Sequence, residues 1–245
     1  MNYLHSIGLY FLMIKEMFRK PTKWSVMKQL IFKDIDDLII GSLGIVAFIA
    51  FFVGGVVTIQ TALNITSPLI PKHLVGFATR QSIILEFAPT FISIIMAGKV
   101  GSFITSSIGT MRVTEQIDAL EVMGINSLNY LVFPKVIALM LYPFAIGIAM
   151  FLGILGGLAA CIYGGFTSLE DYIVGIQLDF IPFHMTYAFI KTFIFAFLLA
   201  TIPSFHGYYM KGGALEVGKA STTSFVWTSV MIILLNYILT QMMLS

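Results

Sequence analysis

Residues Ala97 to Asn126 read AGKVGSFITSSIGTMRVTEQIDALEVMGIN, and this stretch decides the fold. It begins as part of an apolar run of membrane type and becomes a polar amphipathic helix, with no loop of any length between the two. Five apolar segments of membrane-spanning length flank or contain it. A hydrophobic chain has little reason to keep the polar residues 114–121 between two spans unless something in water docks there.

The composition places the chain among membrane proteins. Of its 245 residues, 58% are hydrophobic and 11% are charged, whereas a soluble domain carries about 25% charged residues. The net charge of +2 and the lack of a dense basic patch give no indication of a nucleic-acid partner. The single cysteine, Cys161, excludes an internal disulfide framework and a thiolate metal cluster. We therefore expect an all-α membrane protein without a second soluble domain.

The N-terminal residues, Met1 to Lys20, read as an amphipathic helix that ends before Pro21. Apolar side chains recur in it at spacings of three and four. It is too short to span a bilayer, which takes about 20 apolar residues, so we expect an interfacial helix lying on the membrane. The alternatives are a signal-anchor remnant and a helix packed on its own bundle. The organisation predicted is an N-terminal interfacial and cytoplasmic segment, residues 1–37, followed by a five-span domain, residues 38–245.

The five transmembrane helices are expected at about residues 38–63, 79–104, 136–163, 184–205 and 224–244. Basic residues gather in the N-terminal segment and in the second and fourth connections between spans, and such residues favour the cytoplasmic side. An odd number of spans then places the N-terminus in the cytoplasm and the C-terminus outside it. The polar helix between spans two and three is therefore expected in the cytoplasm.

The polar helix mixes two kinds of side chain. Its apolar residues, Ile117, Leu120, Val122 and Met123, can rest on the bundle. Its acidic residues, Glu115, Asp118 and Glu121, can then face a basic groove of a soluble partner. From the residues alone an ordinary amphipathic connector is favoured, since many membrane proteins have one.

The sequence of residues 97–125 closely resembles the signature motif of the YrbE/MlaE family of permeases. Three further segments resemble sequence motifs of that family and occur in the same order along the chain: Glu86–Pro89 (EFAP), Asn129–Lys135 (NYLVFPK) and Gly207–Thr223. The resemblance runs from about residue 38 to the end of the chain. It departs from the usual family residues at Ala88, Lys99, Ser107 and Ser224.

Members of that family are membrane subunits of ABC transporters that move phospholipids or other lipids between bacterial membranes. The resemblance implies a multi-pass protein of the bacterial inner (cytoplasmic) membrane that works as a homodimer, with two ABC ATPase subunits and an MCE-domain substrate-binding protein outside the membrane. The coupling helix that enters the ATPase groove would comprise Thr114, Glu115, Gln116, Asp118, Ala119, Leu120 and Glu121.

The chain itself is not expected to be an enzyme. It contains no Gly-x-x-x-x-Gly-Lys-Ser/Thr motif, so ATP and magnesium are expected on the partner subunit and no cofactor on this chain. No serine or threonine has a neighbouring histidine and carboxylate, so no catalytic residue is predicted. The four histidines lack metal-ligand spacing, so no metal site is predicted.

Two charges lie within the predicted second span. Glu86 and Lys99 are thirteen residues apart, nearly 20 Å along a helix at about 1.5 Å per residue, so they cannot pair within it. We expect Lys99 to extend its ammonium group to the interface. Glu86 could meet Arg80, a lipid headgroup or a partner chain, and Lys191 in the fourth span has no obvious partner.

The lipid cavity can be outlined only through the resemblance, which implies that the first and last spans contribute to it. The candidates are Phe52, Val56, Ile59, Trp227, Met231, Leu234 and Leu235. Two other functions stay open at this point. A secondary transporter driven by an ion gradient would need midplane ionisable residues and an internal repeat, and a membrane assembly factor would perform no transport at all.

Overall fold

The computed structural model describes residues 3–19, 23–65, 70–165 and 167–244. Every regular element in these ranges is a helix, which confirms the all-α prediction. The chain divides into two compact units. The first unit is Met1–Ser42, Ile94–Tyr142 and Ile194–Tyr237, and the second is Leu43–Ser93, Pro143–Phe193 and Ile238–Ser245. Met1, Lys20 and Pro21, on which part of the N-terminal prediction rests, lie outside the described residues.

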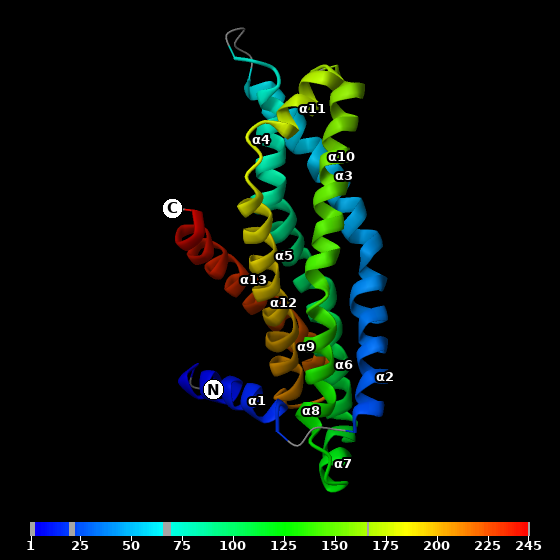
Figure 1. Ribbon diagram of the computed structural model, residues 1–245. Coiled ribbons are helices and arrows are strands. Elements are labelled where there is room, and N and C mark those ends of the chain that lie inside the picture. The colour runs from blue at the N-terminus through cyan, green and yellow to red at the C-terminus, as the bar shows by residue number, and fades with distance from the viewer. Residues whose placement is uncertain (1–2, 20–22, 66–69, 166, 245) are drawn as a thin grey trace. The chain divides into compact units, whose positions relative to one another are not determined.

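Five helices of the described chain are long and apolar enough to cross a membrane, which confirms the predicted number of spans (Figure 1). They are Trp24–Asn64, Leu74–Val113, Ser127–Gly164, Pro182–Tyr208 and Ala214–Leu244. The first two have 41 and 40 residues, about twice the 20 or so that cross the hydrocarbon core. Both therefore continue well beyond that core.

The long helices are assembled from shorter elements, some of them π-helical. The first long helix joins α2 (Trp24–Asp34), η1 (Ile35–Ile40) and α3 (Gly41–Asn64), and the third joins α8 (Ser127–Leu131), α9 (Phe133–Leu139) and α10 (Tyr142–Gly164). The second joins five elements: α4 (Leu74–Ser82), η2 (Ile83–Phe91), α5 (Ile92–Met96), η3 (Ala97–Gly101) and α6 (Ser102–Val113). The last two long helices are single elements, α12 (Pro182–Tyr208) and α13 (Ala214–Leu244).

The helices begin and end outside the spans that hydropathy predicts. The first begins at Trp24, although the apolar run begins near Leu38. Lysine, glutamine and aspartate do not stop a helix, so hydropathy marks the part that can lie in lipid and not the helix ends. The boundary predicted between residues 37 and 38 therefore falls within one continuous helix.

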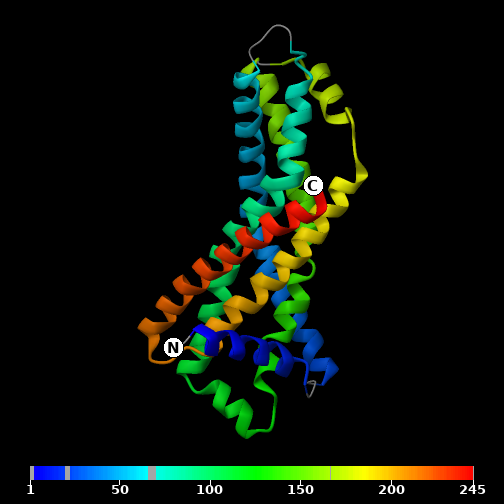
Figure 2. The same cartoon turned by 90° about the vertical axis from the view of Figure 1, so that its left-hand side faces the viewer.

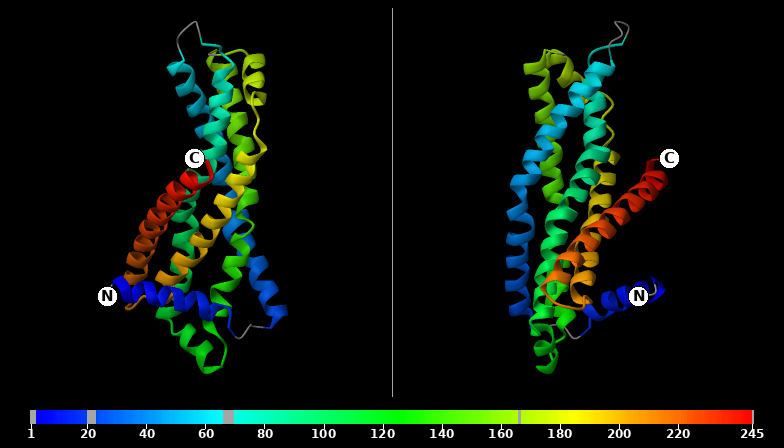
Figure 3. Two further views of the ribbon diagram at one scale, coloured as in Figure 1. Left: turned by 60° about the vertical axis from the view of Figure 1, so that its left-hand side comes forward. Right: turned by 180° about the vertical axis from the view of Figure 1, so that it is seen from behind.

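The N-terminal helix α1 (Tyr3–Met17) has two apolar faces. Met13 and Met17 are fully buried against the first unit, and the Tyr10 hydroxyl lies 2.7 Å from that of Thr201 on α12. Ile7 and Phe11 are 54% and 64% exposed. Figures 2 and 3 show α1 crossing α12 near its C-terminal end. One face thus packs on the helices of its unit, and the other is free to enter a membrane surface.

In the second unit, α3 and α10 approach with their backbones in contact. A Cβ atom on Gly54 would overlap the carbonyl of Gly153, and one on Gly156 would overlap that of Phe51. Small residues permit such close packing in lipid, where van der Waals contact replaces the hydrophobic effect as the attraction between helices. The close approach of α3 to α10 therefore depends on Gly54 and Gly156.

A short helix, α11 (Leu169–Gln177), packs on α4 within the second unit (Figure 2). Glycines make the contact possible, because a Cβ on Gly76 would overlap the carbonyl of Tyr172 and one on Gly175 that of His73. Burial raises the pKa of Tyr172, so its hydroxyl stays protonated and donates to the Ile154 carbonyl at 3.1 Å. The connection between the third and fourth spans is thereby held in place.

Candidate functional site

The predicted polar helix exists as α7 (Gln116–Val122), which lies beyond the ends of α6 and α8 at the bottom of Figure 1. Thr114 and Glu115 form the turn before it. Glu115 has a left-handed backbone, with φ of 59°, and Gly124 after the helix has φ of 74°. A left-handed conformation costs a residue with a side chain roughly 1–2 kcal/mol. Two sharp reversals therefore set α7 apart from the helices on either side.

Most of the predicted docking residues are exposed: Thr114, Glu115, Gln116, Asp118, Ala119 and Glu121. Leu120 is half-buried, and Ile117 is fully buried and anchors the helix. Val122 and Met123, expected against the bundle, are instead 89% and 65% exposed. The exposed surface of α7 therefore combines acidic groups with an apolar end.

The acidic side chains of α7 differ in their surroundings. Asp118 pairs with Arg112 at 2.8 Å, and Glu121 accepts hydrogen bonds from the hydroxyls of Ser127 at 3.0 Å and Tyr208 at 2.9 Å. Glu115 has no recorded side-chain partner within the described residues. Only part of the acidic set is thus free to meet another protein.

Two asparagines fasten the segment after α7 to α1. Asn126 donates from Nδ2 to the carbonyls of Glu16, at 2.8 Å, and Arg19. Asn129 donates from Nδ2 to the Met17 carbonyl at 2.7 Å. The last carbonyls of a helix have no partner within it, so these amides satisfy the end of α1. The interfacial helix and α8 are therefore held together.

An open groove of about 580 Å³ lies in the first unit between α6 and the start of α13. Its lining carries hydroxyl groups and small side chains and no ionisable group. The residues are Ser102, Ser106, Thr110, Val113, Thr114, Ala214, Val217, Gly218, Ser221 and Thr222. The groove reaches Thr114, directly before α7.

Glu86 pairs with Lys191 in the second unit, at 3.0 Å. Lys191 is fully buried and also contacts the Tyr187 hydroxyl and the Leu85 carbonyl, each at 3.0 Å. Lys191, which had no obvious partner in the sequence, has three.

The carboxylate of Glu86 has further polar neighbours. Thr90 donates to it at 3.1 Å from the same helix, and Thr240 donates at 3.3 Å from α13. Its side chain is 41% exposed, whereas that of Lys191 is fully buried. We define Glu86, Lys191, Tyr187 and Thr240 as the charge cluster. The partly exposed carboxylate of Glu86 thus faces the buried ammonium group of Lys191.

Arg80 does not pair with Glu86, which corrects one of the partners considered for that carboxylate. Its guanidinium group donates to the carbonyls of Ile176 at 2.6 Å, Leu178 at 2.8 Å and Asp179 at 3.3 Å. These carbonyls follow at the end of α11, where helix partners run out. Arg80 therefore fixes α11 to α4.

The family model described as Permease MlaE matches residues 31–242. The chain belongs to the MlaE permease family. Its relatives include a probable ABC transporter permease protein of Rickettsia bellii, 33% identical over 94% of this chain and 87% of that protein. A probable ABC transporter permease protein of Synechocystis is 33% identical over 82% of this chain and 77% of its own length.

A third relative is the protein TRIGALACTOSYLDIACYLGLYCEROL 1, chloroplastic, of Arabidopsis thaliana. It is 30% identical over 82% of this chain and 57% of its own length. The family and these relatives establish an ABC transporter permease that passes the membrane several times, and membership implies an ATPase partner.

One segment of this MlaE permease comes close to a nucleotide-binding motif. Residues 213–220 read GALEVGKA, which departs from the phosphate-binding pattern only in having Ala220 where serine or threonine is needed. The segment opens α13 instead of forming a loop between a strand and a helix, and Lys219 pairs with Glu216 at 2.7 Å. It therefore lacks both the magnesium ligand and the setting of a phosphate-binding loop.

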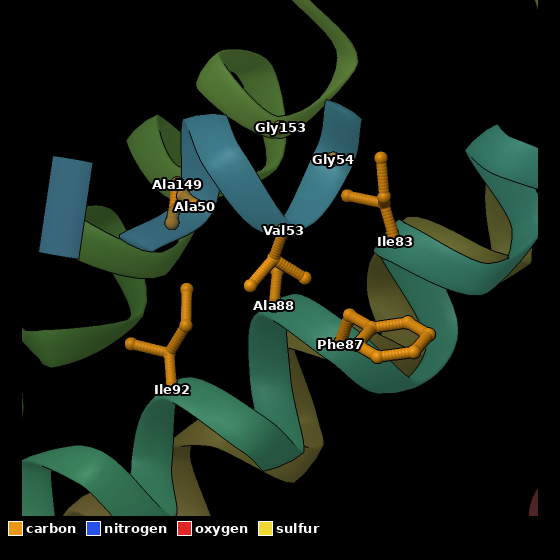
Figure 4. A pocket seen from close by; sticks show the side chains of 9 residues that line it. All are labelled: Ala50, Val53, Gly54, Ile83, Phe87, Ala88, Ile92, Ala149 and Gly153. Carbon is orange, nitrogen blue, oxygen red and sulfur yellow. The ribbon is translucent and has the colours of Figure 1, made fainter. Parts of the chain in front are cut away.

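The remaining predicted residues are placed as follows. Lys99 is exposed and donates to the Gly41 carbonyl. Of the seven lipid-cavity candidates, four are exposed: Phe52 and Val56 in the second unit, and Trp227 and Leu234 in the first unit. The other three are half-buried: Ile59, Met231 and Leu235. Neither the groove nor the pocket of Figure 4 is lined by any of the seven lipid-cavity candidates.

The pocket of Figure 4 lies in the second unit, where Val53 of α3 points toward Ala88 and Ile92 on the second long helix. Its volume is about 10 Å³, close to the space of a single water molecule. It can hold no lipid chain. In the described residues, no group of three histidine, cysteine, aspartate or glutamate side chains is arranged to hold a metal ion.

Proposed function

We propose that this permease moves phospholipids or related lipids between bacterial membranes, driven by a separate ATPase subunit that docks on α7. The observation that carries the proposal is the exposed surface of α7, with Glu115 unpartnered among the described residues at its start and Val122 exposed at its end. Acidic side chains complement a basic groove, and an exposed apolar end suits the centre of an interface.

The name of the Arabidopsis relative supports a lipid cargo, because that name refers to a diacylglycerol lipid. The composition of the spans agrees with it, because a lipid needs an apolar path with few polar groups. We infer a homodimer, since five spans make a poor closed pathway alone and a two-fold pair suits two ATPases. The cavity candidates from Phe52 to Leu235 would then face the second copy or the cargo.

The remaining parts of the proposal concern place and partners. The permease lies in the bacterial inner membrane, with the N-terminus and α7 in the cytoplasm and the C-terminus in the periplasm, as the basic residues favour. An MCE-domain protein meets the opposite side, where Arg80 fixes α11. ATP and magnesium belong to the partner ATPase.

A secondary transporter is the second candidate, because the charge cluster places ionisable groups inside a span. An ion pair of this kind also serves as a structural link between two spans, and transport measured with an inactive ATPase separates the two roles. An assembly factor without transport predicts that changes in α7 affect complex formation alone.

Reconstituted vesicles separate these functions. The permease with its ATPase is expected to move fluorescent phospholipid with ATP and to stop when the ATPase carries a dead Walker lysine. Undiminished transport with the dead ATPase would overturn the proposal in favour of the secondary transporter. Mass spectrometry of co-purifying lipid then identifies the cargo, and a vesicle assay without any transport would favour the assembly factor.

A further inference from the structure

The hydroxyl of Tyr208, the last residue of α12, lies between α7 and α8. It is 2.9 Å from Oε1 of Glu121 and 2.8 Å from Oγ of Ser127, and Ser127 Oγ is 3.0 Å from the same carboxylate oxygen. The two hydroxyls carry one proton each and the carboxylate carries none. Two of the three contacts are therefore hydrogen bonds at any one time.

The two hydroxyl-bearing residues of this contact are buried, whereas Glu121 itself is exposed on α7. Tyr208 is 8% exposed and Ser127 is 3% exposed. Hydrogen bonds to a charged group contribute more than neutral ones, and burial strengthens them further. Glu121 thus holds the C-terminal end of α7 to the end of α12, although the carboxylate was predicted to face the partner.

The ring of Tyr208 is also engaged. The guanidinium group of Arg112 lies 5.8 Å from the ring centroid and pairs with Asp118 on α7 at 2.8 Å. A cation over an aromatic face is attracted to it. Asp118 and Glu121 of α7 are therefore both linked to Tyr208, Glu121 directly and Asp118 through Arg112.

Resting on the proposed function, we propose that Tyr208 transmits movement of α7 into α12, and that Glu121 is a positioning residue and not a docking residue. A helix docked on an ATPase does work on the permease only if it is fastened to a span. α7 joins α6 through a left-handed turn at Glu115 and joins α8 after a second reversal at Gly124, whereas Tyr208 fastens it to a continuous helix of 27 residues.

The test is Tyr208→Phe, which keeps the ring and removes the hydroxyl. The ATPase is expected to co-purify and to hydrolyse ATP as with the wild type, while phospholipid moved per ATP falls about tenfold, in keeping with the loss of bonds to a charged group. The matched control is Tyr209→Phe, because the neighbouring hydroxyl has no recorded hydrogen bond among the described residues. It should transport normally.

A second variant keeps the test sharp. Glu121→Ala should give the same loss with the ATPase still bound, and combining it with Tyr208→Phe should add nothing, because both remove one link. Normal transport by Tyr208→Phe, release of the ATPase by either variant, or additive losses would overturn the inference. If wild-type vesicles show no ATP-dependent transport, the proposed function fails instead, and the two failures are distinguishable.

Discussion

Charge reversal on α7, by Glu115→Lys with Asp118→Lys, is expected to release the ATPase subunit from the permease. Placing like charges across an interface costs several kcal/mol, and each 1.4 kcal/mol is about a tenfold loss of affinity, so we expect a loss of about 100-fold or more. Co-purification and lipid-stimulated ATP hydrolysis measure it, and both should fall together.

Two further variants show which carboxylate is responsible. Asp118 holds Arg112 at 2.8 Å, so its reversal also disturbs the packing of α7, whereas Glu115 has no recorded partner in the described chain. Glu115→Lys alone is expected to account for much of the loss. The control is Glu170→Lys, which reverses an exposed acidic residue of α11. Wild-type ATPase binding by the double variant would rule out α7 as the docking helix.

The stability of the protein is expected to respond unequally to loss of the two charged members of the charge cluster, Glu86 and Lys191. Glu86→Leu leaves a fully buried ammonium group without its counter-charge, and breaking such a pair costs about 3 kcal/mol or more. Lys191→Met leaves a carboxylate that still accepts hydrogen bonds from Thr90 and Thr240, so we expect about half that cost. Thermal unfolding in detergent micelles measures both free energies.

The double variant, Glu86→Leu with Lys191→Met, serves as the control for the pair. It removes both charges, so its cost should be smaller than the sum of the two single costs by about 1 kcal/mol or more. Equal costs for the single variants together with simple addition in the double would show that Glu86 and Lys191 do not depend on each other.

The sequence predicted the fold because lipid imposes a simple rule: backbone groups inside the bilayer must bond within helices. Each predicted span accordingly lies inside an observed helix. Helix ends were missed where polar residues continue the helix into water, as between Trp24 and Asp37. The packing of α1 was left open because its two apolar faces cannot be assigned to protein or lipid by periodicity alone.

The candidate site was predictable where it is local. The alternation of acidic and apolar residues predicted α7, and Ile117 is buried as that pattern requires. Its inward contacts were not predictable, because Tyr208 is 87 residues from Glu121 and hydropathy does not give the register between helices. Glu86 and Lys191, 105 residues apart, escaped notice for the same reason.

A single exposed cysteine can test the central claim, that a cytoplasmic ATPase acts on this permease through α7. Cys161 is the one cysteine of the sequence and is buried, so Ala119→Cys on α7 and Val174→Cys on α11 each provide one accessible thiol. A maleimide photocrosslinker at position 119 is expected to capture the ATPase subunit, and the same reagent at position 174 is not. Capture from position 174 alone, or a thiol at position 119 that reacts only from the periplasmic side, would contradict the account.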